Sequence, residues 1–363
     1  MRAVVSALRA ERLTQGPRVE AFEEAFARAL HRRHAVAVSS GTAALHAAVA
    51  GLRLPAGSEV ITSPLTFAAT ANVLVLSGLV PRFADVDPDS GVLSPDSAAA
   101  AIGRRTAALL PVDYSGYPCD AQAFRTLARR HSLALLEDAT HLLGGSQRGR
   151  PAGALADAAA FSLHPSKAIA AGEGGVVVTD DGALAERLRR FRENGLRRAR
   201  AGEPPWHYEM NAPGLNYRLS DLHAALAAAQ LRRLGAFVRR RGILARRYLR
   251  RLRGCAGLEL PPLPSAPGDR HAWHLFVVRL RPPAPSRRHV FAALHSRGIA
   301  AQVHYRPVGS LRYYRERWPR ALADCPQARR FSSRCLSLPL FPSLGSRDLA
   351  RVIGALRQGL RRA

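Results

Sequence analysis

Lysine is almost absent from this chain. Its 363 residues include 54 lysines and arginines, and only Lys167 is a lysine. An arginine-rich sequence could lose its other lysines by chance. A guanidinium stays protonated, however, whereas an amine with a lowered pKa can lose its proton and condense with an aldehyde as a Schiff base. Lys167 is therefore a candidate reactive residue.

Cysteine is also scarce, and its four residues are scattered. No two of them form a CxxC pair, which argues against a disulfide framework and against a zinc site. They are Cys119, Cys255, Cys325 and Cys335. We therefore expect no metal, and we expect the protein to work in a reducing cytoplasm.

A continuous membrane-spanning segment is missing as well. The first 13 residues alternate charged and apolar side chains, so we expect no signal peptide. Residues 62–81 carry no charge and are long enough to span a bilayer. They contain Pro64 and Asn72, however, and end in Ser-Gly-Leu-Val-Pro. A buried helix followed by a strand is the better prediction, and we expect no membrane partner.

Acidic residues are half as frequent as basic ones, 27 against 54, and the net charge is +27. Such a surplus fits nucleic-acid binding through phosphates, but it also fits the binding of anionic small molecules. The arginines are spread over the whole chain, and no zinc-finger, RNP or basic-zipper pattern accompanies them. We therefore do not expect nucleic acid to be the main partner.

Apolar strands alternate with helical segments over the first half of the chain. This alternation predicts an α/β fold with a mostly parallel sheet that is covered by helices on both faces. Residues 194–217 are irregular and too long for a simple connector, and such loops are often functional. The predicted strands are 35–38, 60–63, 80–84, 107–112, 133–137, 158–163 and 175–179, and the predicted helices are 20–30, 43–52, 67–76, 95–102, 120–130 and 182–192.

The rest of the chain predicts bridging helices and a small C-terminal unit. Ser220 is expected to cap a helix, and this helix and the next one continue to about residue 253. The proline-rich residues 260–269 predict a linker. We expect a large domain over 1–253, bridged from about 220, and a small α+β domain over 254–363. The elements predicted in the small domain are strands 273–280 and 299–305 and helices 287–297, 327–335 and from 346 onwards.

Two groups of polar residues follow predicted strands at the carboxyl edge of the sheet. Ser40, Gly41 and Thr42 form a strand-to-helix turn, where free N–H groups and hydroxyls can bind a phosphate. Ordinary helix capping is the simpler alternative for this turn. Asp138 follows a buried strand, so it could pair with the ring nitrogen of a pyridoxal cofactor or only cap the next turn.

The same edge carries an aromatic residue and the lone lysine. Phe67 begins a helix there, and its ring could stack on a cofactor or belong to the core. Lys167 follows a further strand after a break at Pro165, which places it on a loop. A phosphate-binding turn, a carboxylate, an aromatic ring and a lysine together indicate a pyridoxal phosphate site.

Several motifs occur in an order typical of one protein family. They are residues 13–17 (LTQGP), 40–45 (SGTAAL), 66–72 (TFAATAN), 137–141 (EDATH), 161–167 (FSLHPSK), 172–175 (GEGG), 215–221 (LNYRLSD) and 338–340 (LPL). Over nearly the whole chain, the sequence resembles the DegT/DnrJ/StrS family of sugar aminotransferases. The resemblance implies the fold type I of pyridoxal-phosphate-dependent transferases, with a large domain and a small C-terminal domain.

The resemblance also implies a role for individual residues. Lys167 would form the Schiff base with pyridoxal 5′-phosphate, and Asp138 would pair with its ring nitrogen. Asn216 would reach the phosphate of the second subunit, which implies a homodimer with shared active sites. The residues implied in cofactor binding are Ser40, Gly41, Thr42, Phe67, Asp138, His141, Ser162, Lys167 and Asn216, and those implied in substrate binding are His164, Tyr217 and His304.

Within the family, residues 113–120, 164–167 and 302–305 look most like PseC-type enzymes. These enzymes aminate C4 of a UDP-linked 4-keto-6-deoxy-N-acetylhexosamine on the way to pseudaminic acid. The implied reaction transfers an amino group from glutamate to such a nucleotide sugar. Another keto-sugar or a cyclitol is an alternative acceptor, and a degenerate cofactor-binding or nucleic-acid-binding protein is the non-enzyme alternative. A sugar dehydratase is disfavoured because that branch carries a histidine in place of Lys167.

The chain departs from the family pattern in three places. It begins close to the LTQGP motif, where family members usually have a further N-terminal segment. Ala170 and Ala171 stand where related enzymes often carry threonines, and Gly309 stands where PseC-like enzymes tend to have a histidine. These departures leave the identity of the keto-sugar open.

Overall fold

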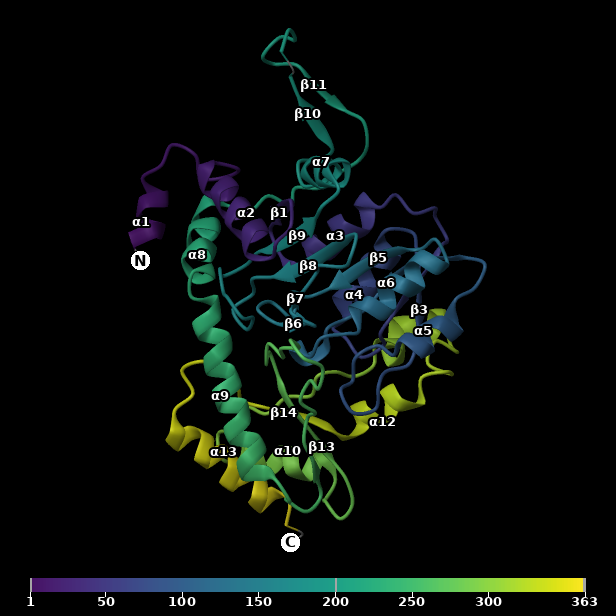
Figure 1. Ribbon diagram of the computed structural model, residues 1–363, viewed down its shortest axis with the longest axis vertical. Helices are drawn as coiled ribbons and strands as arrows, with labels where there is room; N and C mark the ends of the chain where they lie inside the picture. The colour runs from purple at the N-terminus through teal and green to yellow at the C-terminus, as the bar shows by residue number, and fades with distance from the viewer. Residues whose placement is uncertain (1, 200, 362–363) are drawn as a thin grey trace.

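A seven-stranded sheet forms the centre of the computed structural model, which describes residues 2–199 and 201–361 (Figure 1). Its strand order is β1-β9-β8-β5-β4-β2-β3, and β9 runs antiparallel to both of its neighbours while the other pairs are parallel. The α/β class and the mostly parallel sheet are thus confirmed. The strands are β1 (His34–Val38), β2 (Glu59–Thr62), β3 (Val80–Phe83), β4 (Thr106–Leu110), β5 (Ala134–Asp138), β8 (Ala158–Ser162) and β9 (Gly175–Thr179).

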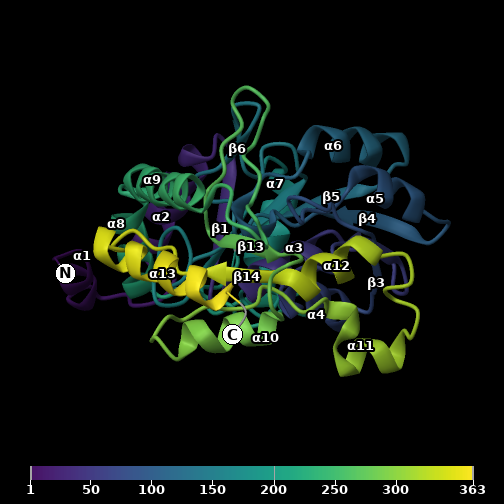
Figure 2. The ribbon, with the colours of Figure 1, turned by 90° about the horizontal axis from the view of Figure 1, so that it is seen from below.

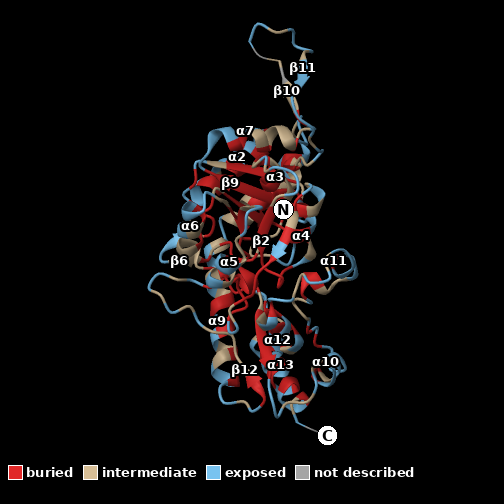
Figure 3. Ribbon diagram, turned by 90° about the vertical axis from the view of Figure 1, so that its right-hand side faces the viewer, coloured by how far each residue is buried: buried red, intermediate tan, exposed pale blue. Residues whose placement is uncertain are grey.

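Helices pack on both faces of this sheet because its strands are apolar on both sides. In β1, Ala35 and Ala37 join one buried cluster, whereas Val36 and Val38 join another. The first cluster includes residues of α2 (Pro17–Ala29), α5 (Pro95–Ala101), α6 (Ala121–Arg130) and α8 (Asp221–Leu231). The second includes residues of α3 (Gly41–Gly51), α4 (Ala68–Leu76) and α7 (Gly182–Phe191). The buried layer runs through the middle of the molecule in Figure 3.

A second, three-stranded antiparallel sheet lies at the far end of the long helix α9 (Leu234–Leu252) (Figures 1 and 2). It has a buried cluster of its own with α9, α10 and α13. The elements of this region are β12 (Leu258–Glu259), β13 (Phe276–Leu280), β14 (Cys335–Leu338), α10 (Arg287–His295), α11 (Arg312–Arg317), α12 (Pro326–Arg334) and α13 (Ser346–Gly359). The division into domains at residue 253 stays a prediction.

The strand predicted over residues 299–305 is wrong. Only Gln302 pairs there, in an isolated bridge with Ser337. The chain then leaves the small sheet, and the His304 side chain bonds the Ser337 hydroxyl instead of continuing a ladder. The third strand of the sheet is β14, which follows the predicted helix directly and was not predicted.

Two irregular segments contain more structure than the sequence indicates. Residues 194–217 include the hairpin β10 (Leu196–Arg198) and β11 (Tyr208–Met210), which projects from the body of the molecule (Figures 1 and 3). The predicted linker over residues 260–269 contacts the hairpin of β6 (Ser146–Gln147) and β7 (Arg150–Pro151). The Ser146 hydroxyl donates to Gly268 O at 2.8 Å. A short α1 (Arg2–Leu8) lies near the N-terminus. None of the helices described is both long and apolar enough to cross a bilayer.

Candidate active site

The beginning of α3 and the end of β8 approach each other closely. Gly41 and Thr42 are the first residues of α3, where backbone N–H groups have no acceptor within the helix. A Cβ atom on Gly41 would lie 2.7 Å from the Cβ of Ser162, so a larger residue would not fit without a shift. Ser40 caps the helix by accepting the Ala43 N–H at 3.1 Å. The result is a narrow cradle of N–H groups and hydroxyls that suits a phosphate.

Asp138 is the last residue of β5 and is only 2% exposed. Its Oδ2 accepts the hydroxyl of Thr70 at 2.7 Å, and its Oδ1 accepts the N–H of Thr140 at 3.2 Å. The Thr70 hydroxyl also lies 2.8 Å from that of Thr66. Asp138 forms no ion pair with the residues that the structure describes. A buried carboxylate that is held in this way suits a protonated ring nitrogen.

Lys167 lies half-buried on the loop after β8, as the sequence predicts. Its backbone N–H donates to His164 O at 2.9 Å, which closes a tight turn. Burial lowers the pKa of the Lys167 amine to about 8, although the negative charge of Asp138 opposes this change. An amine with such a pKa exchanges protons near neutral pH, which an arginine at this position could not do.

Buried imidazoles form one wall beside Lys167. The rings of His141 and His274 lie 4.1 Å apart, and His141 Nε2 lies 3.4 Å from the hydroxyl of Tyr305. Burial, and then the charge of Lys167, lower the pKa of His141 well below its usual value. His141 Nδ1 and His274 Nδ1 are both buried and have no hydrogen-bond partner in the described structure. The wall is therefore neutral, and it has unused hydrogen-bonding capacity.

A cavity of about 470 Å³ opens next to Lys167 and includes His304. His304 Nδ1 bonds the Ser337 hydroxyl at 2.8 Å, and burial lowers the pKa of His304 to about 4. His164 is exposed, and its Nδ1 lies 2.9 Å from the Ser166 hydroxyl. The structure thus places His304 in the Lys167 cavity, whereas His164 lies on the exposed side of the loop.

Phe67 lies at the N-terminus of α4, at the same edge of the sheet. Its side chain is 62% exposed, so it is not the core residue that was the alternative interpretation. The ring centroid lies 6.1 Å from that of Tyr305. An exposed aromatic ring beside Tyr305 can stack on a planar ligand.

Asn216 and Tyr217 are not brought to the Lys167 cavity within one chain. The Tyr217 hydroxyl lies 3.0 Å from His46 Nδ1 of α3, and its ring packs against Phe191 beside the second buried cluster. Asn216 is exposed, and its backbone pairs with that of Glu193. The expected role of Asn216 therefore requires a second copy of the chain.

Sequence reasoning missed four residues of the site: Thr70, Arg241, His274 and Tyr305. Thr70 follows Thr66 by one helical turn, so the spacing within the TFAATAN motif could have indicated that the two hydroxyls meet. Tyr305 directly follows the predicted His304 within the motif at 302–305, which could have indicated it. Arg241 and His274 come from distant parts of the chain, and no local pattern marks them.

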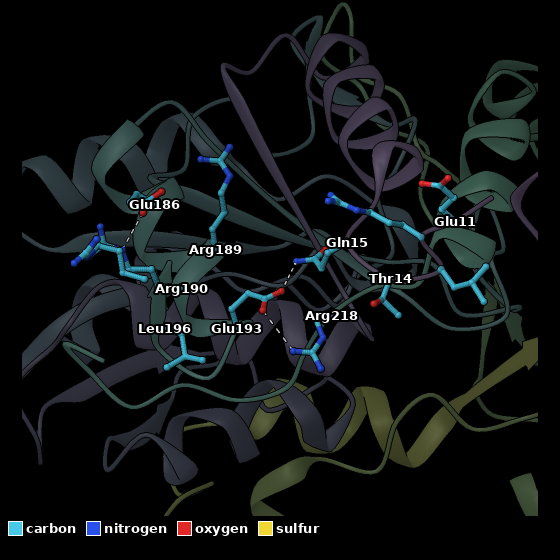
Figure 4. Close-up of a pocket in the computed structure, with 12 residues that line it drawn as sticks. Glu11, Thr14, Gln15, Glu186, Arg189, Arg190, Glu193, Leu196 and Arg218 are labelled. Atoms are coloured by element: carbon cyan, nitrogen blue, oxygen red, sulfur yellow. Dashed lines mark hydrogen bonds and ion pairs between the residues drawn. The ribbon is translucent and has the colours of Figure 1, made fainter. Parts of the chain in front are cut away.

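A larger cavity, of about 1070 Å³, lies elsewhere, between the N-terminal segment and α7 (Figure 4). Its polar lining is dominated by arginines and glutamates that pair with one another. Glu193 accepts Gln15 Nε2 at 3.0 Å and Arg218 Nη1 at 3.4 Å, and Arg190 bonds Glu186 at 2.9 Å. Neither a lysine nor a histidine lines this cavity.

Comparisons with known proteins identify the family and the fold of this chain. The sequence profile of the DegT/DnrJ/EryC1/StrS aminotransferase family matches residues 1–357. The spore coat polysaccharide biosynthesis protein SpsC of Bacillus subtilis is 38% identical over 352 residues, which cover 95% of this chain and 90% of SpsC.

Solved structures of aminotransferases also superpose on the chain. Helicobacter pylori PseC, an aminotransferase of pseudoaminic acid biosynthesis, matches with a TM-score of 0.92 and 30% identity, over 99% of this chain and 95% of PseC. DesV of S. venezuelae matches with a TM-score of 0.91 and 36% identity, over 100% of this chain and 94% of DesV. The similarity therefore extends over essentially the whole fold.

Proposed function

Because this chain belongs to the DegT/DnrJ/EryC1/StrS aminotransferase family, we propose that it transfers the amino group of glutamate to a nucleotide-linked 4-keto-6-deoxysugar. The chain is a sugar aminotransferase that depends on pyridoxal 5′-phosphate. The observation that carries the proposal is the pair of Lys167, with its pKa lowered to about 8, and the buried Asp138 at adjacent strand ends.

The residues at the edge of the sheet fit this cofactor. When bound, pyridoxal 5′-phosphate supplies an aldehyde and an electron-withdrawing ring. Asp138 would pair with the ring nitrogen, and Phe67 and His141 would contact the ring. The phosphate would be held by Ser40, Gly41, Thr42 and Ser162, and by Asn216 of a second subunit. The closeness of Gly41 to Ser162 and the unused Nδ1 of His141 support this placement.

Lys167 is the residue best placed to move protons. Its pKa of about 8 allows the amine to release a proton and to take one up at neutral pH. The half-buried position of Lys167, beside the neutral ring of His141, limits the access of water to the transferred proton. His304 lies in the same cavity, where it can contact the sugar. His164 and Tyr217 would contact the substrate only in a dimer.

A homodimer with shared sites completes this proposal. The projecting hairpin and its flank expose Trp206, Tyr208 and Met210, which are 81%, 66% and 61% exposed. A group of exposed apolar side chains can mark a protein–protein interface. A second copy that covers them would also bring Asn216 to the opposite site. The four cysteines are free thiols, which supports a reducing compartment such as the cytoplasm.

The proposed acceptor is the UDP-linked 4-keto-6-deoxy-N-acetylhexosamine of PseC-type enzymes, and the product would be of the UDP-4-amino-4,6-dideoxy-N-acetyl-altrosamine type. The similarity to PseC supports this choice. Another keto-sugar is the second candidate, because SpsC, at 38% identity, is a spore coat polysaccharide biosynthesis protein.

An assay with glutamate and a panel of UDP- and dTDP-linked 4-keto-6-deoxysugars tests the proposal. We expect 2-oxoglutarate release and an amino-sugar whose mass identifies the acceptor, with the UDP-N-acetylhexosamine substrate turned over fastest. Lys167→Arg is the matched control, because it keeps a cation on the same loop. Turnover of dTDP-sugars alone would reject the PseC-type acceptor, and turnover of none of the panel would reject the reaction.

A further inference from the structure

Arg241 of α9 is a buried cation that faces the Lys167 cavity. It is 4% exposed, and its Nη1 donates to Leu340 O at 2.8 Å and to the carbonyls of Trp273 and His274 at 3.2 Å. Its Nη2 has only a long contact of 3.5 Å with Ser166 O. Its Nε is buried without a partner in the described structure. The guanidinium therefore has donors to spare, chiefly along the Nη2 edge.

The other buried arginines are neutralised, and Arg241 is not. Arg32 pairs with Asp180 at 3.2 Å, Arg192 pairs with Glu23, and Arg279 pairs with Asp89 at 3.0 Å and with Glu259 at 3.3 Å. Arg241 has no carboxylate within ion-pair distance among the residues described. Burial lowers the pKa of Arg241 to about 10, so the group is still charged at neutral pH. A buried charge without a partner is unfavourable, and an anionic ligand would remove that penalty.

The cavity can admit such a ligand. Its volume of about 470 Å³ lies within the range of small-molecule sites. Arg241 and Lys167 line it together, and Gln230, Gln302 and His274 add neutral polar groups. No acidic side chain lines this cavity, so a bound carboxylate would meet no opposing negative charge in its walls.

We propose that Arg241 binds a carboxylate of the amino donor in this cavity and thereby holds the donor beside Lys167. This inference depends on the proposed function in one respect: it assumes that the amino donor is an amino acid such as glutamate. A guanidinium edge matches the two oxygens of a carboxylate, and hydrogen bonds between charged groups are the strong ones. The Nη2 edge is the part of Arg241 that binds the carboxylate, and the Nη1 contacts keep the side chain in place.

Calorimetric titration of the cofactor-loaded protein with glutarate tests this proposal. Glutarate has both carboxylates of glutamate and no amino group, so it binds without reacting. We expect Arg241→Met to weaken glutarate binding about tenfold to a hundredfold, and Arg241→Lys to weaken it less. The matched control is Arg240→Met on the same helix, since Arg240 donates to Pro342 O and Leu344 O at 3.1 Å and does not line the cavity. Arg240→Met should bind glutarate as the parent protein does.

A second measurement needs no variant and therefore does not depend on folding. The unmodified protein should bind glutarate at least tenfold more tightly than its neutral diamide, glutaramide. Equal binding of the two compounds, or equal glutarate binding by a folded Arg241→Met, would overturn the proposal. Neither measurement uses a sugar, so failure of every sugar in the acceptor panel would reject the proposed reaction and leave the result on carboxylate binding intact.

Discussion

Two of the cavities in this molecule, the arginine-lined cavity and the Lys167 cavity, differ in how far their charged side chains are exposed to water. The arginine-lined cavity of Figure 4 is the larger, at about 1070 Å³ against about 470 Å³. Its charges pair with one another near the surface, as in Arg190–Glu186 and Arg218–Glu193. Partly exposed pairs of this kind contribute little to the free energy of folding.

The smaller cavity has fewer charges, but burial changes them. It lowers the pKa of Lys167 to about 8 and that of His304 to about 4. Groups with shifted pKa values gather where proton transfer takes place, because a catalyst needs a pKa near the working pH. Desolvation, rather than volume or the number of charges, therefore distinguishes the proposed reaction site from the larger cavity.

Replacing the lone lysine should produce the largest effect. Lys167→Arg keeps a positive charge but cannot release a proton, so we expect transamination to fall about 10²- to 10⁴-fold or more. Borohydride reduction followed by mass spectrometry should attach the cofactor to the parent protein at Lys167 and leave the variant unlabelled. Activity of the variant within tenfold of the parent would show that the reaction does not depend on the Lys167 cavity.

The lowered pKa of Lys167 should be visible directly, because no other lysine competes for reagent. A lower pKa means more neutral amine at any given pH, so labelling of cofactor-free protein should rise with pH through about 8. In denaturant the midpoint should return to about 10.4. Peptide mapping separates Lys167 from the N-terminal amine. A midpoint near 10 in the folded protein would show that burial does not shift this group.

Removing the charge of Asp138 should have the next largest effect. Asp138→Asn keeps the shape and an acceptor for Thr70 but loses the negative charge, so we expect transamination to fall about tenfold to a hundredfold. The labelling midpoint of Lys167 should move to lower pH, because Asp138 raises that pKa. Thr70→Val is the control: it removes one hydrogen bond and leaves the charge. An unchanged midpoint in Asp138→Asn would contradict the proposed coupling.

The sequence predicts the central sheet and the residues at strand ends well, because these depend on local patterns. Apolar segments locate β5 and β8, so Asp138, at the end of β5, and Lys167, on the loop after β8, must lie at one edge of the sheet. Arg241 and His274 reach the cavity from α9 and from the segment before β13, more than 70 residues beyond Lys167 in the chain. No local pattern encodes such an approach. The wrong strand at 299–305 also shows the limit of local patterns. Its apolar residues suggest a strand, but whether they pair is decided by distant parts of the chain, and only Gln302 pairs.

Filling the phosphate cradle should weaken the cofactor without touching the lysine. A Cβ in Gly41→Ala would meet Ser162 at 2.7 Å, so either α3 or β8 must shift. We expect a loss of about 1–3 kcal/mol in unfolding free energy and weaker cofactor binding. Gly103→Ala is the control, because nothing lies within 4 Å of its added Cβ. Thermal unfolding and cofactor titration measure both, and normal cofactor affinity in Gly41→Ala would remove the cradle from the site.

The smallest effect is expected in the arginine-lined cavity. Arg190→Gln breaks the pair with Glu186 one helical turn away, where Arg190 Nε and Glu186 Oε1 are 2.9 Å apart. Such an exposed pair contributes at most about 0.5 kcal/mol, so thermal unfolding should change little. The rate at which glutamate converts the bound cofactor, measured without sugar, should stay within about twofold of the parent. A loss of more than about tenfold in that rate would mean that paired surface charges take part in the first half of the reaction. Desolvation would then no longer separate the two cavities.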